Sequence, residues 1–156
     1  MRFVATLGFS RGGHLLAMVK KNTQKLPHLN GKWNGIGGKM EIGESPVGAA
    51  MREFTEETGI TVAKDEMVFV EHQRFINGIL GGTRCVGDEI YWYAIMLPWN
   101  TYLPSHNDVR EELGWLGLHH GRVETGWDES RLCPNLDYLV PKALVFLRTP
   151  YLDRPA

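Results

Sequence analysis

Residues 45–59 carry the strongest local structural signal in this chain. Ser45 is a favourable N-cap residue, and Pro46 suits the first helical position, where its missing N–H has no intrahelical partner. Gly59 tolerates the left-handed conformation in which many helices end. The sequence therefore predicts a helix of about three and a half turns between these residues.

One side of this predicted helix is apolar and another is acidic. At about 100° per residue, one side collects the following residues: Val47, Ala50, Met51, Phe54 and Thr58. Glu53, Glu56 and Glu57 fall within a separate arc of about 100°, at spacings i, i+3 and i+4. We expect the apolar side to be buried and the three carboxylates to converge beside it.

Folding alone does not favour these three glutamates. Like charges at i,i+4 destabilise a helix by roughly 0.2–0.5 kcal/mol, and the last turns of a helix favour cations. A hard divalent cation resolves the conflict, because Mg²⁺ takes carboxylate oxygens and keeps waters and substrate phosphates as its other ligands. The alternative is a solvated acidic face with Arg52 as its partner. The sequence predicts a site for Mg²⁺, or alternatively Mn²⁺.

The acidic group lies within a longer pattern of fixed spacing, residues 38–60. Five residues separate Gly38 from Glu44, and seven separate Glu44 from Arg52. The pattern matches the Nudix box, Gx5Ex7REUxEExGU with U an apolar residue, at every fixed position. The matching residues are Gly38, Glu44, Arg52, Glu53, Phe54, Glu56, Glu57, Gly59 and Ile60. The chain therefore resembles the Nudix hydrolases, which cleave a nucleoside diphosphate linked to another moiety and use Mg²⁺ or Mn²⁺.

This resemblance also concerns the run that precedes the box, Trp33-Asn34-Gly35-Ile36-Gly37-Gly38-Lys39. A similar lead-in occurs in the Nudix members that hydrolyse nucleoside triphosphates, including the oxidised-purine triphosphatases of the MutT type. It implies that the Gly37 carbonyl is a metal ligand together with Glu53, Glu56 and Glu57, that Lys39 lies near phosphate, and that Asn34 contacts the base. The alternatives are that Trp33 is a packing residue rather than a stacking platform and that Asn34 occupies a turn.

Two further segments resemble functional parts of the family. Many Nudix enzymes have a glutamate before a tryptophan-containing strand that binds metal or accepts the proton of the attacking water. Ahead of Trp115, Glu112 is the first candidate, Glu111 the second and Asp108 a third. Asn135 matches a position that reads the base edge in purine triphosphatases. The animal oxidised-purine enzyme has an aromatic residue and two acids where this chain has Cys133, Asn135 and Leu136.

Glu44 and Arg52 are too far apart to meet along one helix. The loop between Gly38 and Ser45 can fold Glu44 back onto Arg52, giving a charge-assisted and potentially bidentate pair. Such a pair would support the site by orienting the neighbouring carboxylates.

The rest of the sequence predicts an α/β fold in which helices enclose a mixed sheet, and the resemblance identifies this fold as the Nudix α/β/α sandwich. Residues 1–156 are expected to form one domain. Residues 3–9 and 14–20 predict a hairpin, and residues 61–62, 67–76 and 88–97 predict strands. Residues 136–147 predict an apolar helix that Pro141 kinks or begins. The glycine-rich residues 77–87 predict a loop, either a lid or an incidental connection.

Charge and composition restrict the partners. The chain has 17 basic and 18 acidic residues and a net charge of −1, so we expect no nucleic-acid polymer as a partner. Lys20, Lys21 and Lys25 either solubilise a loop or supply a contact to phosphate. Cys85 and Cys133 predict two reduced thiols, and the adjacent His119 and His120 would point to opposite faces of a strand rather than share a metal. We expect a cytoplasmic monomer or homodimer without a membrane span.

The predicted reaction is the hydrolysis of a nucleoside triphosphate to a monophosphate and pyrophosphate, with Glu53 or Glu112 as the proton acceptor. A second hypothesis is hydrolysis of another diphosphate, such as ADP-ribose, a dinucleoside polyphosphate or an mRNA cap. A third is a nucleotide-sensing module without catalysis, which would be expected to lack carboxylates of the box; this chain retains them all.

Overall fold

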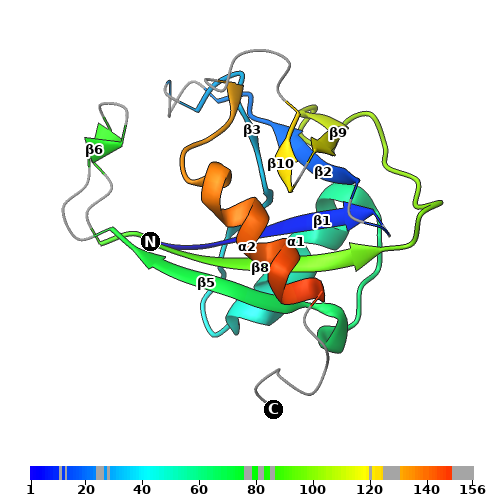
Figure 1. Cartoon of the computed structure of the whole chain (residues 1–156). Helices are drawn as coiled ribbons and strands as arrows, with labels where there is room; N and C mark the ends of the chain where they lie inside the picture. Colours follow the sequence, from blue (N-terminus) through cyan, green and yellow to red (C-terminus); the bar gives the residue numbers. More distant parts are fainter. Residues whose placement is uncertain are drawn as a thin grey trace.

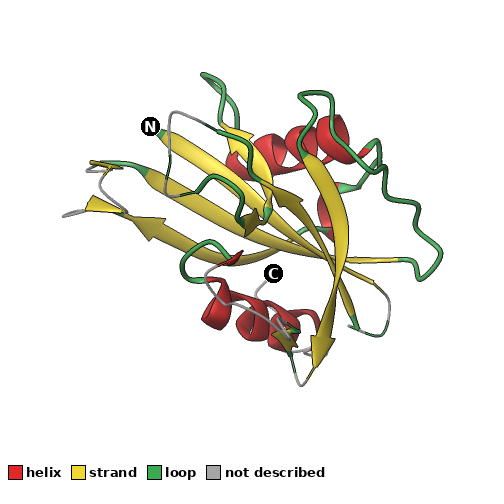
Figure 2. Ribbon diagram, turned by 90° about the horizontal axis from the view of Figure 1, so that it is seen from above, coloured by secondary structure: helices red, strands yellow, loops and turns green. Residues whose placement is uncertain are grey.

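The computed structural model describes residues 1–10, 12, 14–23, 27, 29–75, 79–80, 83–84, 87–119, 121–124 and 131–148. A mixed sheet of eight strands lies between two helices (Figures 1 and 2). The helices are α1 (Pro46–Thr58) and α2 (Leu136–Arg148), and a 3₁₀ turn, η1, spans Lys64–Glu66. The strands are β1 (Arg2–Ser10), β2 (Leu15–Lys20), β3 (Trp33–Asn34), β4 (Ile36–Lys39), β5 (Val68–Arg74), β6 (Ile79–Leu80), β7 (Thr83–Arg84), β8 (Glu89–Leu97), β9 (Glu112–His119) and β10 (Arg122–Val123). The predicted α/β/α sandwich is confirmed.

The sheet is organised around β1. Its strands follow the order β10-β9-β2-β1-β8-β5, while β3 pairs with β2 and β4 pairs with β1. β1 runs parallel to β8 along its full length, and its other edge pairs with β4 through residues 3–6 and with β2 through residues 8–9. The segment 33–39 therefore begins beside β2 and ends beside β1. This crossing brings the glycines of β4 under α1, which contacts β4 and β1.

Helix α1 has the predicted caps. Ser45 is extended (φ −75°, ψ 153°) and its Oγ accepts a hydrogen bond from Gly48 N, while Gly59 has φ 76° and donates its N–H to the Thr55 carbonyl. The fully buried residues are Ala49, Ala50, Phe54 and Thr58, and Val47 and Met51 pack at the edge of the same core. Ala49 extends the buried side beyond the predicted stripe. The acidic side of α1 is thus left facing the loops that follow β4 and β8.

Helix α2 covers the opposite face of the sheet (Figure 2). The predicted stripe is buried, with Leu136, Leu139, Val140, Ala143 and Leu144 in the core and Leu147 packed against it. Pro141 lies inside this helix and not in its first turn. Lys142 Nζ reaches Glu71 Oε1 of β5 at 2.8 Å, which fixes the helix to the edge of the sheet.

The prediction of a strand at residues 61–62 is wrong. These residues are irregular, and Val62 instead packs into the core beneath α1. The segment connects the αL cap of α1 to the turn η1, and Val62 is buried there without lying in a strand. The predicted strands at 67–76 and 88–97 are confirmed as β5 and β8, with Ile76 outside the described residues.

Some predictions fall outside the described residues. Lys25, Cys85 and His120 lie there, as does most of the predicted loop 77–87 apart from β6, β7 and Gly87. Within the part of the chain that the structure describes, neither helix has the length and apolar character needed to cross a bilayer.

Candidate active site

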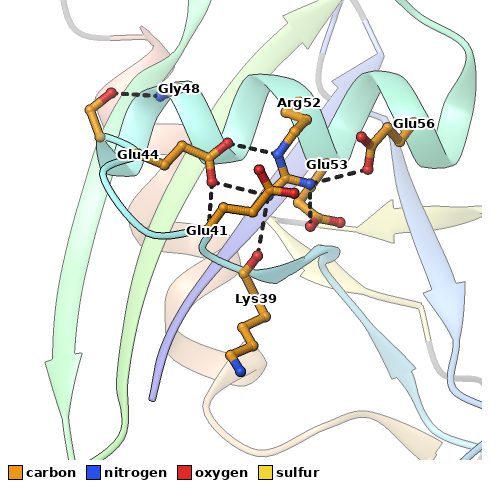
Figure 3. A network of polar contacts seen from close by, with 8 residues as sticks. Lys39, Glu41, Glu44, Gly48, Arg52, Glu53 and Glu56 are labelled. Atoms are coloured by element: carbon orange, nitrogen blue, oxygen red, sulfur yellow. Dashed lines mark hydrogen bonds and ion pairs between the residues drawn. The ribbon is translucent and has the colours of Figure 1, made fainter.

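Arg52 is the centre of a polar network on α1 (Figure 3). Its Nε donates to Glu44 Oε1 at 2.7 Å and its Nη2 donates to Glu44 Oε2 at 3.0 Å. The predicted bidentate pair is therefore confirmed. Nη2 also reaches the Lys39 carbonyl at 3.2 Å, and Glu44 Oε2 accepts the Glu41 N–H at 2.9 Å. The hydrogen bond from Arg52 lowers the pKa of Glu44. Together these bonds fix the loop after β4 to the helix.

The third guanidinium nitrogen of Arg52 joins two of the predicted metal ligands. Nη1 donates to Glu53 Oε1 at 2.8 Å and to Glu56 Oε2 at 3.1 Å (Figure 3). Among the described residues, no three His, Cys, Asp or Glu side chains are grouped in a geometry that could hold a metal. Arg52 supplies the positive charge at Glu53 and Glu56 here, so a bound cation would replace its Nη1 contacts.

Two glycines of β4 allow the backbone to approach this network. A Cβ atom on Gly38 would lie 2.6 Å from Glu53 Oε2, and one on Gly37 would lie 2.0 Å from the Val4 carbonyl. Both distances are shorter than any real contact of a side chain. Gly37, whose carbonyl is a predicted metal ligand, is thus packed against Val4 of β1, and the next residue, Gly38, is packed against Glu53 of α1.

Glu57 carries the clearest electrostatic conflict of the site. Its Oε2 is buried and has no hydrogen-bond partner among the described residues. Burial raises the pKa of Glu57 to about 7; Glu111 and Glu53 also raise it, while Lys21 and a hydrogen bond from Asn107 lower it, so that only Oε2 of this carboxylate is left without a partner in the described part of the chain. Burial likewise raises the pKa of Glu53, against the effect of Arg52. A buried carboxylate oxygen without a partner requires a proton or a cation. Carboxylate oxygens are the ligands that a hard divalent cation takes, so the chemistry of these side chains fits such an ion, while their arrangement with Arg52 between Glu53 and Glu56 is not that of a bound metal.

Glu111 is the carboxylate that the chain adds from outside the helix. It is 7% exposed, and its Oε2 accepts the Asn22 N–H at 2.8 Å. Its Oε1 lies 3.3 Å from both Lys21 Nζ and Asn107 Nδ2, and its own N–H donates to Asn107 Oδ1 at 2.7 Å. The turn that presents it contains Arg110 with φ 63°. Glu111 is thus held firmly within electrostatic reach of Glu57.

The structure does not bring Glu112, the first candidate from the sequence, to this cluster. Glu112 is exposed, and its Oε2 lies 4.0 Å from Lys20 Nζ, while Asp108 is exposed as well. The alternation of β9 explains the difference, because Leu113 packs into the core beneath α1. Successive side chains point to opposite faces of a strand, so Glu111, two residues before Leu113, lies on the same face as Leu113, and Glu112 lies on the other face. Counting back by two from Leu113 would have selected Glu111.

The predicted substrate residues lie in two neighbouring segments. Lys39 is exposed, and Figure 3 shows its side chain extending away from the carboxylates. Asn34 lies in β3, where it pairs with Val19, and not in a turn, and its Oδ1 accepts the Gly35 N–H at 2.8 Å. Trp33 is buried, and a Cβ on Gly114 would lie 3.0 Å from its ring, so the packing interpretation of Trp33 is confirmed.

Asn135 belongs to a segment whose backbone is hydrogen-bonded to β3, the strand that contains Asn34. It has φ 74° and lines a cavity of about 390 Å³ with Arg122, Val123, Leu132, Cys133, Pro134, Leu136 and Asp137. Cys133 N donates to the Trp33 carbonyl at 2.9 Å, which ties the segment that carries Asn135 to β3. Asn34 is not among the residues lining this cavity. Burial raises the pKa of Cys133 to about 11, which agrees with a packed, unreactive thiol.

Comparison with known proteins places these features in a family. A model of the NUDIX domain matches residues 2–128. The oxidized purine nucleoside triphosphate hydrolase of Danio rerio is 59% identical over 32 residues, which are 20% of this chain and 20% of that protein. The match thus spans about a fifth of the curated relative.

Solved structures agree on the architecture. A MutT/nudix family protein from Enterococcus faecalis has a TM-score of 0.59 at 14% identity, covering 78% of this chain and 46% of that one. The MutT protein of Bacillus halodurans has a TM-score of 0.52 at 21% identity, covering 73% and 66%. A bifunctional NMN adenylyltransferase/ADP ribose pyrophosphatase from Francisella tularensis, complexed with AMP and Mn, has a TM-score of 0.57 at 17% identity, covering 76% and 34%. With the family model matching most of its length, this chain belongs to the NUDIX domain family and has the fold of the MutT/Nudix proteins.

Proposed function

We propose that this protein hydrolyses a nucleoside triphosphate to a nucleoside monophosphate and pyrophosphate in a Mg²⁺-dependent reaction. The observation that carries the proposal is the buried, unpartnered Oε2 of Glu57, within reach of Glu53 and Glu111 and inside a complete Nudix box. Burying such a carboxylate costs folding free energy, and a bound divalent cation would offset that cost.

The carboxylates of Glu53, Glu56 and Glu57 and the carbonyl of Gly37 would hold the cation. A bound Mg²⁺ supplies two effects, a lower pKa for a water ligand and neutralisation of the phosphate charge. The bonds of Arg52 to Glu44 do not involve Nη1, so Arg52 would still hold the loop that carries Glu44 against α1 when a cation is bound.

Glu53 or Glu111 accepts the proton of the attacking water. Both approach the cluster from fixed positions, Glu53 against Gly38 and Glu111 between Asn22 and Asn107. A positioned glutamate of this kind contributes about 10²–10⁴-fold to rate. Of the two, Glu111 lies on a different element from the three helix carboxylates, and this leaves it the better candidate for proton transfer.

A nucleoside triphosphate is favoured over other diphosphates by the sequence of residues 33–39 and by the short match to the oxidized purine nucleoside triphosphate hydrolase of Danio rerio. We assign Asn34 and Asn135 to the base and Lys39 to the phosphates. Asn135 is supported by the cavity that it lines.

A Mg²⁺-dependent panel tests the proposal. The panel contains the common (d)NTPs, 8-oxo-dGTP, ADP-ribose, a dinucleoside polyphosphate and a cap analogue. The triphosphates are scored for pyrophosphate against phosphate release, and the other compounds for the two phosphorylated fragments that cleavage of their diphosphate yields. We expect pyrophosphate from a triphosphate, and we expect EDTA to abolish turnover. Faster turnover of ADP-ribose or a cap analogue than of every triphosphate would overturn the substrate class. Binding without turnover of any compound would instead favour a nucleotide sensor.

A further inference from the structure

Lys21 is, after Arg52, the second cation of the acidic cluster, which consists of Glu53, Glu56, Glu57 and Glu111. Its backbone is fixed. The residue follows β2 directly, its N–H donates to the Lys32 carbonyl at 2.8 Å, and its carbonyl accepts the Gly31 N–H at 2.7 Å. These two bonds set the position of its Cα. The side chain is 24% exposed and carries Nζ to 3.3 Å from Glu111 Oε1. Lys21 therefore approaches the cluster from the sheet, opposite the helix that carries Arg52.

Glu111 does not depend on Lys21 for its position. Its Oε2 is bound by the Asn22 N–H at 2.8 Å, and Asn107 both donates to its Oε1 and accepts its N–H. The Lys21 contact of 3.3 Å is longer than the roughly 2.7–2.9 Å of strong charge-assisted bonds. If Nζ left, Glu111 would remain in place. The ion pair is therefore the exchangeable contact of this carboxylate.

The two internal cations differ in their freedom to move. Arg52 is a planar fork that makes five hydrogen bonds, two of them to Glu44 and one to the Lys39 carbonyl. Lys21 carries a compact ammonium on a flexible four-carbon stem with rotatable donors. Lys21 also interacts electrostatically with Glu57, whose pKa it lowers. A divalent cation bound at Glu57 would replace this attraction and repel the ammonium of Lys21, which would then turn toward the anion that the site receives.

We propose that Lys21 is a switching cation, which pairs with Glu111 while the carboxylates lack a metal and contacts the phosphates of the substrate once a metal is bound. This inference rests on the proposed function. It assigns to Lys21 a contact that the sequence left open among three lysines. It also explains why a buried acidic cluster carries a lysine that its geometry does not require.

Lys20 is a matched control. It is the adjacent residue in sequence, but its Nζ lies 4.0 Å from the exposed Glu112 and 5.9 Å from the centre of the Trp33 ring. Lys20→Met removes the same charge from the same stretch without touching the cluster. Lys21→Arg keeps the positive charge at the cluster. If Lys21→Met shows no thermal unfolding transition and is therefore not folded, Lys21→Gln removes the same charge with a polar side chain.

Two binding experiments on the full chain test the switch. In the first, Mn²⁺ alone is titrated and followed by electron paramagnetic resonance. Lys21→Met should bind Mn²⁺ about two- to fivefold more tightly than the wild type, because a competing cation is gone. In the second, calorimetry in Mg²⁺ compares the α,β-imido analogue of dGTP with dGMP. Lys21→Met should weaken the analogue about tenfold and leave dGMP within about twofold, while Lys21→Arg retains most of the affinity.

A double variant separates a phosphate contact from a structural effect. In a Glu111→Gln background, Lys21→Met should still weaken the imido analogue about tenfold. If Lys21→Met no longer weakens binding of the imido analogue in that background, Lys21 acts only through Glu111. If Lys20→Met weakens binding of the analogue as much as Lys21→Met does, the loss reflects the net charge of the protein and not a contact of Lys21. Either result overturns the proposal. The failure of the proposed function is seen separately, as wild-type protein that hydrolyses no triphosphate.

Discussion

Replacement of Glu57 by glutamine should stabilise the metal-free protein, and the size of the effect follows from the site. Glu57 has an ordinary pKa of 4.5 and a folded-state pKa of about 7, chiefly because of burial. Each pKa unit corresponds to about 1.36 kcal/mol, so ionising this group in the fold costs about 3 kcal/mol. Glutamine has nearly the same shape and no charge. Glu57→Gln should therefore raise the free energy of unfolding by up to about 3 kcal/mol above pH 7.

The pH dependence has a defined sign. Between pH 4.5 and 7 the folded wild type binds more protons at Glu57 than the unfolded chain does. Its stability therefore falls as pH rises through this window, relative to the variant. Below pH 4.5 the carboxyl is protonated in both states and the two proteins should be equally stable. The gain of the variant should thus develop between pH 4.5 and 7 and stay constant above it.

Urea denaturation in EDTA at pH 4.5 and pH 8, repeated at pH 8 in excess Mg²⁺, measures this effect. Mg²⁺ should stabilise the wild type more than the variant, since the variant lacks a ligand. Glu56→Gln is the control, because Glu56 is exposed and paired with Arg52 and so gains nothing from losing its charge. Equal stability of wild type and Glu57→Gln at pH 8 in EDTA, or equal stabilisation of both by Mg²⁺, would refute the reasoning.

Outcomes are also expected for five other variants. Glu56→Gln should lower kcat by about 100-fold or more with an unchanged far-ultraviolet dichroism spectrum, and full turnover in excess Mg²⁺ would remove it from the metal site. Glu111→Gln should cost about 100-fold in kcat. Glu112→Gln should stay within about twofold, and the reverse order would restore the choice made from sequence. Arg52→Lys should lower the free energy of unfolding by about 1–2 kcal/mol in urea, because the planar fork is lost. Asn135→Ala should reduce discrimination between purine and pyrimidine triphosphates about tenfold in kcat/KM while slowing the best substrate less, and equal losses would contradict a base contact.

The parts of the fold that are encoded locally could be predicted from the sequence. Ser45, Pro46 and Gly59 specify both ends of α1 through their own backbone preferences, and the structure has the caps at those residues. The pairing of Glu44 with Arg52 was also predictable, because the intervening loop is short and the two charges are complementary. The pair Thr61-Val62 misled the prediction, because Val62 can be buried in a core without lying in a strand.

The parts that depend on distant segments could not be predicted in the same way. Nothing near Glu111 indicates that Asn22, 89 residues away, will bind its carboxylate. The choice between Glu111 and Glu112 depended on which face of β9 meets α1, a relation between elements and not a property of the acidic run. Likewise, the glycines of β4 suggested a close approach, but only the fold identifies Val4 and Glu53 as the groups approached.

The parallel pairing of β1 with β8 has a consequence for how the protein is made. During synthesis β1 finds its longest partner only when Glu89–Leu97 has emerged, since Arg2 pairs with Glu89 and Ser10 with Leu97. Until then the β1–β2 hairpin and α1 can form, but one edge of β1 remains unpaired and available to other chains. Such non-local pairing slows folding and prolongs exposure of apolar surface. Nascent chains that stall before β8 therefore present an open strand edge, so chaperone binding during synthesis is expected to concentrate on the first half of the protein.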